Sequence, residues 1–303
     1  MNKTFKNLLL IPMNILYIMS PKTELKLMFY LKHGYKLNLD NPKTYNEKLN
    51  WIKLYYHNEL MPVCADKYAV RQYVNDCGCG DILNDLLWEG FDASEIPFDD
   101  LPKQFVIKVT HGSGNNIICK NKDELNKEKT RKQLNKWLKN KYLPCYGEWF
   151  YGVVKPRIII ETFLCENNLN IPEDYKMFYF NNKEGAEGVG VTAIYSDKFI
   201  NQNSTLYDAE WNILSDVFFD NLPNNNLFEK PELYEKMIDY AKILSFPFPH
   251  VRVDFYVIRE KIYFGELTFI NGAGFDKITP HSFDEIMGNW IKLPNKQVRN
   301  IEI

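Results

Sequence analysis

One stretch near the C-terminus, residues 251–257, alternates apolar and polar side chains with the period of a β-strand. Its apolar positions share one face of that strand: Val251, Val253, Phe255 and Val257. The opposite face carries Arg252, Asp254 and Tyr256. Because the apolar face must be buried against a core, the strand can take only one orientation in any stable fold. Its charged face is therefore turned toward solvent or a functional site.

A second stretch, residues 262–269, repeats the alternation less regularly. We expect Phe264, Glu266 and Thr268 on one face of this strand. The other face would carry three apolar or aromatic residues: Tyr263, Leu267 and Phe269. The short polar link at residues 259–261 predicts that the two stretches pair as a β-hairpin.

The register of this hairpin decides whether two carboxylates meet. A three-residue loop makes the numbers of paired residues sum to 520, so that Asp254 faces Glu266 and Arg252 faces Thr268. A sum of 519 would separate them. Opposed carboxylates destabilise a sheet unless a cation lies between them, and Mg²⁺ binds one or two carboxylates together with phosphate oxygens. The sequence therefore indicates a magnesium site, with an ordinary solvated sheet face as the alternative.

A glycine-rich turn follows a predicted strand at residues 105–109, which carries Lys108. The turn contains Gly112, Ser113 and Gly114, and glycines let backbone amides approach phosphate oxygens while a lysine adds positive charge. The segment has neither a Walker motif nor the third glycine of a dinucleotide-binding motif. A plain hairpin turn beside an edge-strand lysine is the alternative.

Two further charged residues interrupt strand-like runs: Glu161 in residues 157–163, and Lys176 in residues 175–180. Each alone is typical of a side chain that faces solvent. Together with Lys108, the glycine-rich turn and the facing carboxylates, they are the groups needed to hold a triphosphate with magnesium.

The other patterns predict an α+β protein. Thr44 and Glu47 form a capping box that starts a helix. Further helices are expected over residues 63–74, 129–142 and 231–244, and a short tail after the last strand. We expect three parts: a largely helical N-terminal lobe at residues 1–103, a small α+β lobe with the glycine-rich turn at 104–165, and a larger lobe with the strand pair at 166–303.

Charge and cysteine content exclude several classes of protein. Lys and Arg number 37 against 39 Asp and Glu, which gives none of the basic surplus of a nucleic-acid-binding protein. The six cysteines form no known disulfide pattern and fit free thiols in the cytosol. Near the N-terminus, Lys3 and Lys6 precede an apolar run at residues 8–19 that is too short to span a membrane. We expect a core-docking or amphipathic segment there, and peripheral membrane contact through it stays open.

The order of these motifs resembles the TupA-like branch of the ATP-grasp fold, a family associated with bacterial surface polysaccharide and teichuronopeptide biosynthesis. The motifs that carry the resemblance lie at residues 41–48, 66–71, 105–114, 159–161, 174–176, 252–256 and 264–269. The resemblance implies an ATP-grasp fold, in which two α+β lobes grip ATP beside an N-terminal helical lobe.

The resemblance also implies which residues bind ATP. Lys67 and Lys108 match two lysines that grip the nucleotide, and Lys176 matches a third cation beside the phosphates. A flap over the phosphates is matched by four residues: Gly112, Ser113, Gly114 and Asn115. A segment that reads adenine is matched by another four: Glu161, Thr162, Phe163 and Leu164. Glu166, Glu173 and Asp174 are candidates for ribose recognition.

The metal ligands and the catalytic groups follow from the same resemblance. Asp254 and Glu266 match two magnesium carboxylates, and Thr268 stands where many ATP-grasp ligases have an Asn, which is a better ligand. Arg252 matches an arginine that stabilises the oxyanion formed when an amine attacks an acyl phosphate. Lys176 is the second catalytic candidate.

The implied activity is that of an ATP-dependent carboxylate–amine ligase. ATP would phosphorylate a sugar (uronic acid) carboxylate, and an amino acid or another amine would then displace phosphate to form an amide. The setting would be capsule or other surface polysaccharide biosynthesis in the cytoplasm, with the inner face of the membrane left open. A glycosyltransferase is the alternative, although Asp254 is not followed by the second Asp of an Asp-x-Asp signature. A glycan-binding module ranks third.

Overall fold

The computed structural model describes residues 10–112, 114–165, 171–182, 187–196, 203–220, 222 and 226–297. Residues 1–9 with Lys3 and Lys6, and also Ser113 and Glu166, lie outside these ranges. In chain order the helices are α2 Ile11–Met19, α3 Pro21–His33, α4 Tyr45–Tyr55, α5 Leu60–Ala65, α6 Val70–Asp76, α7 Lys127–Leu138, α8 Tyr234–Ser245 and α9 His281–Trp290. Single 3₁₀ turns are η1 Gly80–Ile82, η2 Ala93–Glu95, η3 Lys122–Glu124, η4 Pro144–Tyr146, η5 Trp149–Gly152 and η7 Asn271–Gly274.

Within the described ranges, the strands form two larger sheets and one short pair, and all their pairings are antiparallel. The four-stranded sheet has the order β1-β4-β2-β3, and the five-stranded sheet has the order β10-β9-β5-β6-β7. The strands are β1 Leu86–Gly90, β2 Phe105–Val109, β3 Asn116–Cys119, β4 Ile158–Thr162, β5 Asp174–Asn181, β6 Glu187–Ser196, β7 Asn203–Tyr207, β8 Phe218–Phe219, β9 His250–Ile258, β10 Lys261–Thr268 and β11 Ile278–Thr279. The expected α+β architecture is therefore confirmed.

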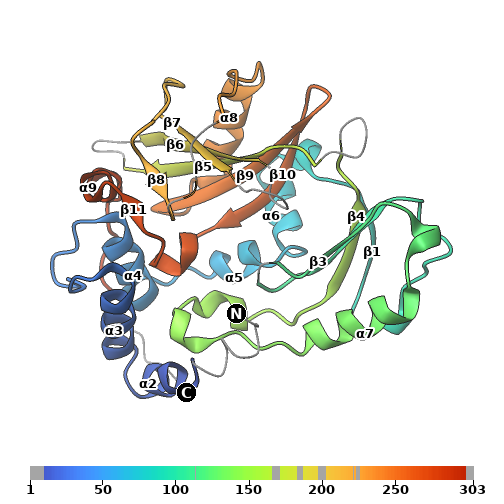
Figure 1. Ribbon diagram of the computed structural model, residues 1–303, viewed down its shortest axis with the longest axis horizontal. Coiled ribbons are helices and arrows are strands. Elements are labelled where there is room, and N and C mark those ends of the chain that lie inside the picture. The colour runs from blue at the N-terminus through green and yellow to red at the C-terminus, as the bar shows by residue number, and fades with distance from the viewer. Residues whose placement is uncertain are drawn as a thin grey trace.

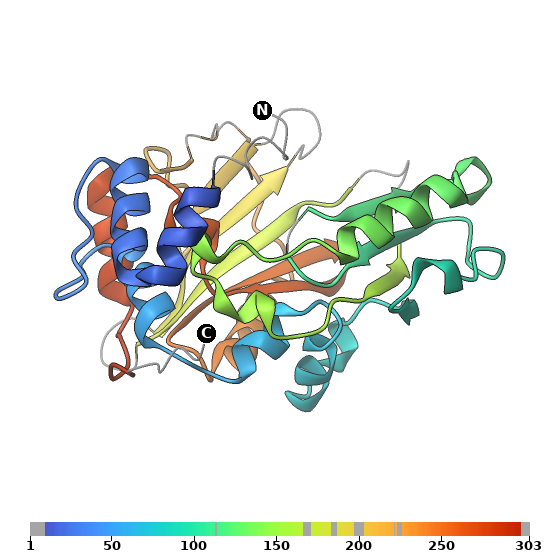
Figure 2. The same cartoon turned by 90° about the horizontal axis from the view of Figure 1, so that it is seen from below.

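Each larger sheet has its own hydrophobic core. Helix α7 lies along the four-stranded sheet and buries Leu134 among Phe105, Ile107 and Ile160 (Figure 2). Helix α8 covers one face of the five-stranded sheet, and its Met237 is fully buried there (Figure 1). Because β1 joins the four-stranded sheet, that sheet contains residues from both sides of the boundary expected at residues 103 and 104.

The capping box is confirmed: the Thr44 hydroxyl accepts from the Glu47 amide at 3.1 Å, and the Glu47 carboxylate accepts from the Thr44 amide at 3.2 Å. The prediction of a single helix over residues 63–74 is wrong, because the helix is interrupted between α5 and α6. Asp66 is extended there, and its Oδ1 accepts from the amides of Tyr68 and Ala69, both at 2.9 Å. A short acceptor side chain competes with the helical backbone bonds in this way. Lys67 consequently lies in a turn instead of on a helix.

The C-terminal hairpin has the expected pairing around Asp254, but its loop is shorter than expected and a β-bulge adjusts the register. Lys261 pairs with Ile258, so the loop has only two residues, Arg259 and Glu260, both with positive φ. Paired numbers near the loop sum to 519, and a β-bulge between Phe264 and Glu266 then shifts the sum to 520.

The bulge has two consequences for the strand faces. Asp254 faces Glu266 and Arg252 faces Thr268, as expected. Phe264 pairs with Phe255 and so shares the apolar face of β9, which contradicts its expected place beside Glu266.

Helix ends differ from the expected ones, and one helix was not expected at all. Helix α7 begins at residue 127, where Asn126 caps the Lys129 amide at 2.9 Å, and α8 begins at residue 234 instead of 231. The expected C-terminal tail contains α9. That helix docks on the start of α4, where the Asp284 carboxylate accepts from the Asn46 amide at 3.1 Å.

Gly288 lets α9 approach α4, and its replacement tests that packing. A Cβ at this position would overlap the carbonyl oxygen of Lys43 and lie 2.7 Å from the carbonyl carbon of Thr44. We expect Gly288→Ala to lower the free energy of unfolding by roughly 3 kcal/mol, although Ala ordinarily stabilises a helix interior relative to Gly. Urea denaturation measures the change. Asn289→Ala, at an exposed position of the same helix, is the matched control and should leave the stability near that of the natural chain.

Glu24 on α3 is fully buried, and neither of its carboxyl oxygens has a hydrogen-bond partner among the described residues. Burial raises its pKa from 4.5 to about 8, although the nearby Lys53 lowers it. The protonated form therefore predominates in the folded chain at neutral pH.

This shift makes stability depend on pH with a defined sign. The pKa of Glu24 is higher in the folded chain than in the unfolded chain. Its protonated form therefore contributes fully to the free energy of unfolding below about pH 4.5, and this contribution is lost as the pH rises through about 8. We expect Glu24→Gln to remove on the order of 3 kcal/mol from the fall in unfolding free energy between about pH 5 and pH 9. Thermal and urea melts at both pH values measure it. The exposed Glu232→Gln control should keep the natural pH dependence, and an unchanged slope in Glu24→Gln would contradict the assignment.

Candidate active site

Three adjacent strands of the five-stranded sheet bring charged side chains together on one face. Lys176 of β5 pairs with Asp254 of β9, and Asp254 pairs in turn with Glu266 of β10. Asp174 and Arg252 lie two residues away from these on the same face, because side chains alternate along a strand. The sheet therefore presents two cations and three carboxylates side by side.

These groups form one ion-pair network. The Lys176 ammonium lies 2.8 Å from Asp174 Oδ2 and 2.5 Å from Asp254 Oδ2. Arg252 donates from Nε to Asp254 Oδ1 at 2.6 Å and from Nη2 to Asp254 Oδ2 at 2.7 Å. The same Nη2 lies 3.2 Å from Glu266 Oε1. Both oxygens of Asp254 are thus bound by cations, whereas Glu266 leaves 41% of its side chain exposed.

Mutual attraction favours the charged forms of Lys176 and Glu266. Burial raises the pKa of Asp254, although Arg252 and Lys176 lower it. Burial and Arg252 each lower the pKa of Lys176, but Asp174, Asp254 and Glu266 raise it above its ordinary range. Burial raises the pKa of Glu266. The attraction of Lys67, followed by that of Arg252, outweighs burial and brings the pKa below its ordinary value. Glu266 is therefore an anion at neutral pH.

The turn after β10 is held in place from two sides. Arg252 Nη1 donates to Asn271 Oδ1, and Asn271 Nδ2 donates to Asp276 Oδ2 at 3.0 Å. From α4, the buried Lys53 ammonium donates to the Ala273 carbonyl, and Asn50 Nδ2 donates to the Gly274 carbonyl at 2.8 Å. The N-terminal helical part thus fixes the loop beside the ion-pair network.

The four-stranded sheet contributes a second charged cluster. Glu161 accepts from Lys108 Nζ at 2.6 Å and lies 3.2 Å from Arg71 Nη1. Arg71 Nη2 also donates to the Asn84 carbonyl at 2.7 Å, and Asn84 Nδ2 donates to the Thr162 carbonyl at 2.8 Å. Glu161 is therefore committed to two cations.

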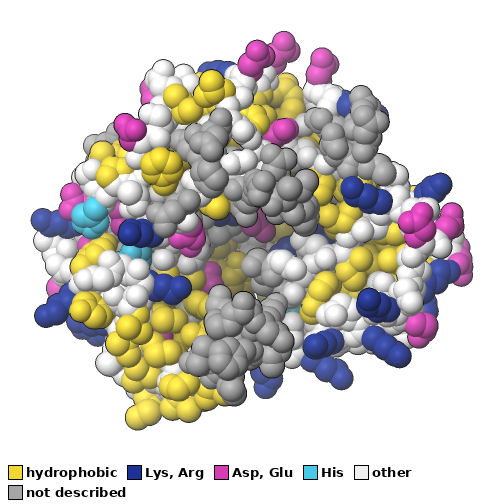
Figure 3. All heavy atoms as spheres, viewed as in Figure 1, with side chains coloured by type: hydrophobic (Ala, Val, Ile, Leu, Met, Phe, Trp, Pro, Cys, Tyr) yellow, Lys and Arg dark blue, Asp and Glu magenta, His cyan; other side chains and the backbone are white. Residues whose placement is uncertain are grey.

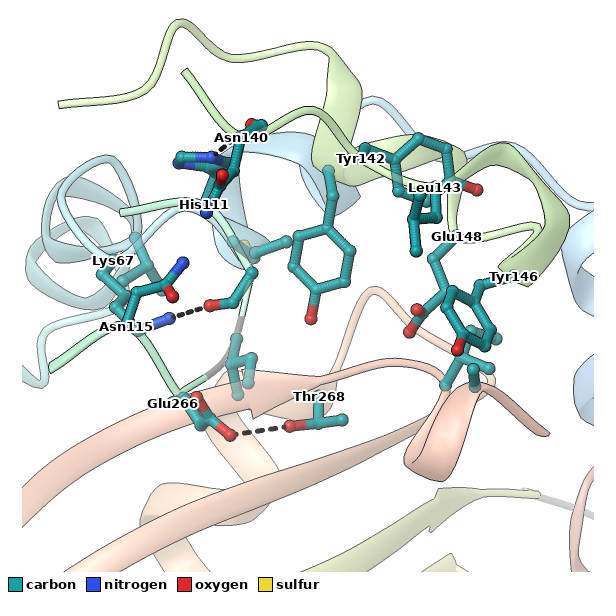
Figure 4. Close-up of a pocket in the computed structure, with 18 of the residues that line it drawn as sticks. Lys67, His111, Asn115, Asn140, Tyr142, Leu143, Tyr146, Glu148, Glu266 and Thr268 are labelled. Atoms are coloured by element: carbon teal, nitrogen blue, oxygen red, sulfur yellow. Dashed lines mark hydrogen bonds between the residues drawn. The ribbon is translucent and has the colours of Figure 1, made fainter. Parts of the chain in front are cut away.

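The glycine-rich turn lies close to Lys67. The Lys67 ammonium donates to the Gly112 carbonyl at 2.7 Å, and a ring nitrogen of His111 lies 2.8 Å from the Asn140 carbonyl oxygen (Figure 4). Gly112 and Gly114 both have positive φ, at 71° and 76°, which glycine adopts without strain. Burial lowers the pKa of Lys67, while Glu266 raises it.

Two cavities meet at Lys67 and Glu266, which line both. The smaller one, of about 260 Å³, has Lys108, Lys176 and Asp254 in its wall. Other predicted site residues also line it: Gly114, Glu161 and Leu164. The larger cavity, of about 780 Å³, has four further predicted site residues in its wall: Gly112, Asn115, Arg252 and Thr268.

The far wall of the larger cavity consists of residues that the sequence did not indicate. Tyr142, Tyr146 and Glu148, from the segment after α7, face the cavity opposite Glu266 and Thr268 (Figure 4). Burial raises the pKa of Glu148 to about 7, and Lys53 opposes this shift. The helix expected over residues 129–142 included Tyr142, but α7 ends at Leu138, and all three residues belong to 3₁₀ turns and loops.

Most of the predicted residues come together, whereas Thr162, Phe163 and the ribose candidate Glu173 line neither of the two cavities. Thr162 pairs with Phe105 inside the four-stranded sheet, and Phe163 is buried. Asp174, expected only as a ribose candidate, is buried beside Lys176. The alternation from 174 to 176 carried a signal for that position, whereas nothing in the pattern indicated the contact between Asn271 and Arg252.

The carboxylates are the groups to test as metal ligands. Among the described residues, no cluster of three or more His, Cys, Asp and Glu side chains is arranged to hold a metal ion. Asp254 and Glu266 are paired across the strands, and the Thr268 hydroxyl lies 3.3 Å from Glu266 Oε1. Two carboxylates with one hydroxyl suit Mg²⁺ when phosphate oxygens complete the set. The donors therefore fit a magnesium–nucleotide complex better than a metal held by protein alone.

Comparison with known families decides the identity of the fold. The family model described as TupA-like ATPgrasp matches residues 47–292, which is most of the chain. The protein belongs to the TupA-like ATP-grasp family. Its fold is therefore the ATP-grasp fold, and the expectation drawn from the motifs is confirmed. No curated protein matches the chain.

Solved structures give weaker likenesses. An ADP complex of purK, N5-carboxyaminoimidazole ribonucleotide synthetase, is 14% identical with a TM-score of 0.47, over 80% of this chain and 56% of that one. A D-alanine–D-alanine ligase from Bacillus anthracis is 18% identical with a TM-score of 0.42, over 68% and 57%. The corresponding ligase from Helicobacter pylori is 16% identical with a TM-score of 0.42, over 77% and 60%. The TupA-like chain spans less than two thirds of the length of these proteins.

Proposed function

We propose that this TupA-like protein is an ATP-dependent carboxylate–amine ligase that joins an amino acid or another amine to a sugar carboxylate, such as that of a uronic acid. The observation that carries the proposal is the pair of cavities that meet at Lys67 and Glu266. One cavity is suited to a nucleotide and the other to an acceptor. A phosphoryl group could pass between them beside Lys67 and Glu266, two of the four residues that line both cavities.

The smaller cavity is the proposed nucleotide site. Lys67, Lys108 and Lys176 would offset the negative charge of the phosphates. Four residues of the glycine-rich turn would cover them: Gly112, Ser113, Gly114 and Asn115. Because Glu161 is committed to Lys108 and Arg71, its proposed role is to hold those cations in place. Adenine recognition would then fall to the chain at residues 162–164, of which Leu164 lines the smaller cavity.

Asp254, Glu266 and Thr268 are the proposed magnesium ligands. Magnesium bound there with the nucleotide would supply positive charge next to the phosphoryl group in transfer. Asp254 is held by Arg252 and Lys176, so these cations set the position of its carboxylate. Glu266 is the more accessible of the two carboxylates.

The proposed reaction has two steps. A carboxylate oxygen of the sugar attacks the γ-phosphorus of ATP, which forms an acyl phosphate and releases ADP. The amine then attacks the acyl carbon, and phosphate leaves with the electrons of the broken C–O bond while the nitrogen loses a proton. Arg252 lies at the larger cavity and would stabilise the oxyanion in the second step, while Lys176 would stabilise the transferring phosphoryl group in the first.

The larger cavity supports a polar acceptor of sugar size. Its volume of about 780 Å³ exceeds what a single amino acid fills. Tyr142, Tyr146 and Trp137 offer flat rings, and Lys136 and Lys141 offer positive charge to an anionic acceptor. This lining fits a uronic acid unit of a capsule or other surface polysaccharide precursor. We place the reaction in the cytoplasm, where ATP is available, at the inner face of the membrane.

Product analysis tests the activity. The protein would be incubated with ATP, Mg²⁺, a pool of uronic acids and a pool of amino acids and amines. We expect ADP and a new mass equal to a uronic acid plus an amine minus water. Consumption of an added sugar nucleotide without ATP consumption would instead establish a glycosyltransferase and exclude the ligase.

A further inference from the structure

We propose that the two N-terminal helices bind the surface of an anionic lipid bilayer. Helices α2 and α3 expose seven large apolar side chains, here called the N-terminal patch: Ile11, Ile15, Ile18, Met19, Leu27, Tyr30 and Leu31. In the described part of the chain 15 large apolar side chains are exposed, so these two helices hold nearly half of them. Concentrations of this kind mark protein or membrane contact sites.

The patch follows the helical repeat. On α2, Ile11, Ile15 and Ile18 recur at intervals of four and three, and no residue of that helix is buried. Helix α3 buries an inner face that includes Phe29, while Leu27, Tyr30 and Leu31 point outward. Packing among the described residues therefore uses one face of α3 and leaves the side chains of the N-terminal patch exposed.

Charge decides which partner fits the patch. Lys22, Lys26 and Lys32 are exposed on α3, whereas Glu24, the sole acidic residue of α2 and α3, is fully buried. Figure 3 shows the apolar surface in yellow at the lower left, where Figure 1 places α2 and α3, with dark blue side chains at its edge. A second copy of the chain would bring like charges together, whereas anionic lipid headgroups complement them.

Helix length restricts the contact to the surface of the bilayer. No helix in the described part of the chain is long and apolar enough to cross a membrane. Helices α2 and α3 have 9 and 13 residues. At about 1.5 Å per residue, each is shorter than the hydrocarbon layer of roughly 30 Å. The helices would therefore lie in the headgroup region with their apolar side chains inserted.

The patch is structurally connected to the larger cavity. The Asn14 side chain of α2 accepts from the Cys145 amide at 3.0 Å, and Tyr146, the next residue of η4, lines that cavity. Lipid binding through the patch would thus hold the acceptor cavity near the bilayer, where a lipid-linked acceptor could reach it. This consequence for the acceptor rests on the proposed ligase function, whereas the lipid binding itself does not.

Vesicle co-sedimentation of the full chain tests the proposal. We expect binding to vesicles of phosphatidylglycerol and phosphatidylcholine, a loss of at least tenfold in the partition coefficient without phosphatidylglycerol, and a similar loss in high salt. Ile15→Gln with Ile18→Gln should weaken binding at least tenfold, and so should Lys22→Gln with Lys26→Gln. All four side chains are exposed, so melting temperatures should stay near that of the natural chain.

A matched control uses apolar side chains outside the patch. Leu227 and Phe246 are 80% and 70% exposed, and their double replacement by Gln should leave binding unchanged. No binding of the natural chain to the anionic vesicles would overturn the proposal, as would equal binding of all variants. A dimer in light scattering that the Ile15/Ile18 double variant dissociates would identify a second copy as the partner and would also overturn it. Ligase assays without vesicles report separately on the proposed function.

Discussion

Glu266→Gln should lower the rate of ATP-dependent ligation by roughly 10³-fold or more, because the proposed magnesium ligand loses its charge where phosphoryl transfer takes place. The neutral amide cannot replace a carboxylate beside Lys67 and Arg252, both of which depress the pKa of Glu266. Asp254→Asn should have an equally large effect. Glu266→Gln is the cleaner variant, since 41% of that side chain is exposed and Asp254 is buried in the ion-pair network. Steady-state ADP release measures both.

The controls for these variants are Glu232→Gln and Asp239→Asn, which make the same chemical changes at exposed positions. Both should retain the natural rate. Melting temperatures show whether Glu266→Gln and Asp254→Asn remain folded. A folded Glu266→Gln protein with a near-natural rate would contradict the proposed role of the carboxylates in the mechanism.

Arg252→Lys should lower amide formation by about 10²-fold while acyl phosphate formation persists. The guanidinium contacts Asp254 through two nitrogens and also reaches Asn271 and Glu266, and a single ammonium cannot make this set of bonds. Hydroxylamine traps an acyl phosphate as a hydroxamate without the amine substrate. We therefore expect Arg252→Lys to give hydroxamate and little amide, and Glu266→Gln to give neither.

The matched control for this change is Arg131→Lys, which replaces a guanidinium on α7 that bonds the carbonyls of Ala93 and Ile96. It should leave both products at natural levels. Equal losses of hydroxamate and amide in Arg252→Lys would place the arginine in the first step or in the structure instead of the second step.

The strand pair shows how far the sequence could predict the site. Alternation placed Asp254 and Arg252 on one face, and their actual neighbours across β10 are those expected. The expected loop length was wrong, and a bulge at Gly265 compensates for it, because the register of a hairpin depends on turn conformation as well as residue count. A Cβ on Gly265 would lie 2.9 Å from the Asp254 carbonyl oxygen, so a glycine suits the bulge.

The parts that the sequence could not predict depend on long-range contacts. Helix α9 forms where Gly288 meets the backbone of α4, and a glycine inside a helix weakens its local signal. The far wall of the larger cavity includes 3₁₀-turn and loop residues such as Tyr146 and Glu148, which no periodic pattern marks. The interruption of the helix before α6, in contrast, has a local cause. The Asp66 side chain accepts hydrogen bonds from the nearby amides of Tyr68 and Ala69, which competes with the helical backbone bonds.

Transfer of ¹⁸O from a labelled carboxylate tests the central claim most directly. Uronic acids carrying ¹⁸O in both carboxylate oxygens would be incubated with the protein, ATP, Mg²⁺ and the amine pool, and the inorganic phosphate would be analysed by mass. Attack of the carboxylate on the γ-phosphorus moves one labelled oxygen into phosphate for each amide formed, so we predict phosphate with a single ¹⁸O. Amide formed together with unlabelled phosphate, or with AMP and pyrophosphate, would contradict an acyl phosphate intermediate.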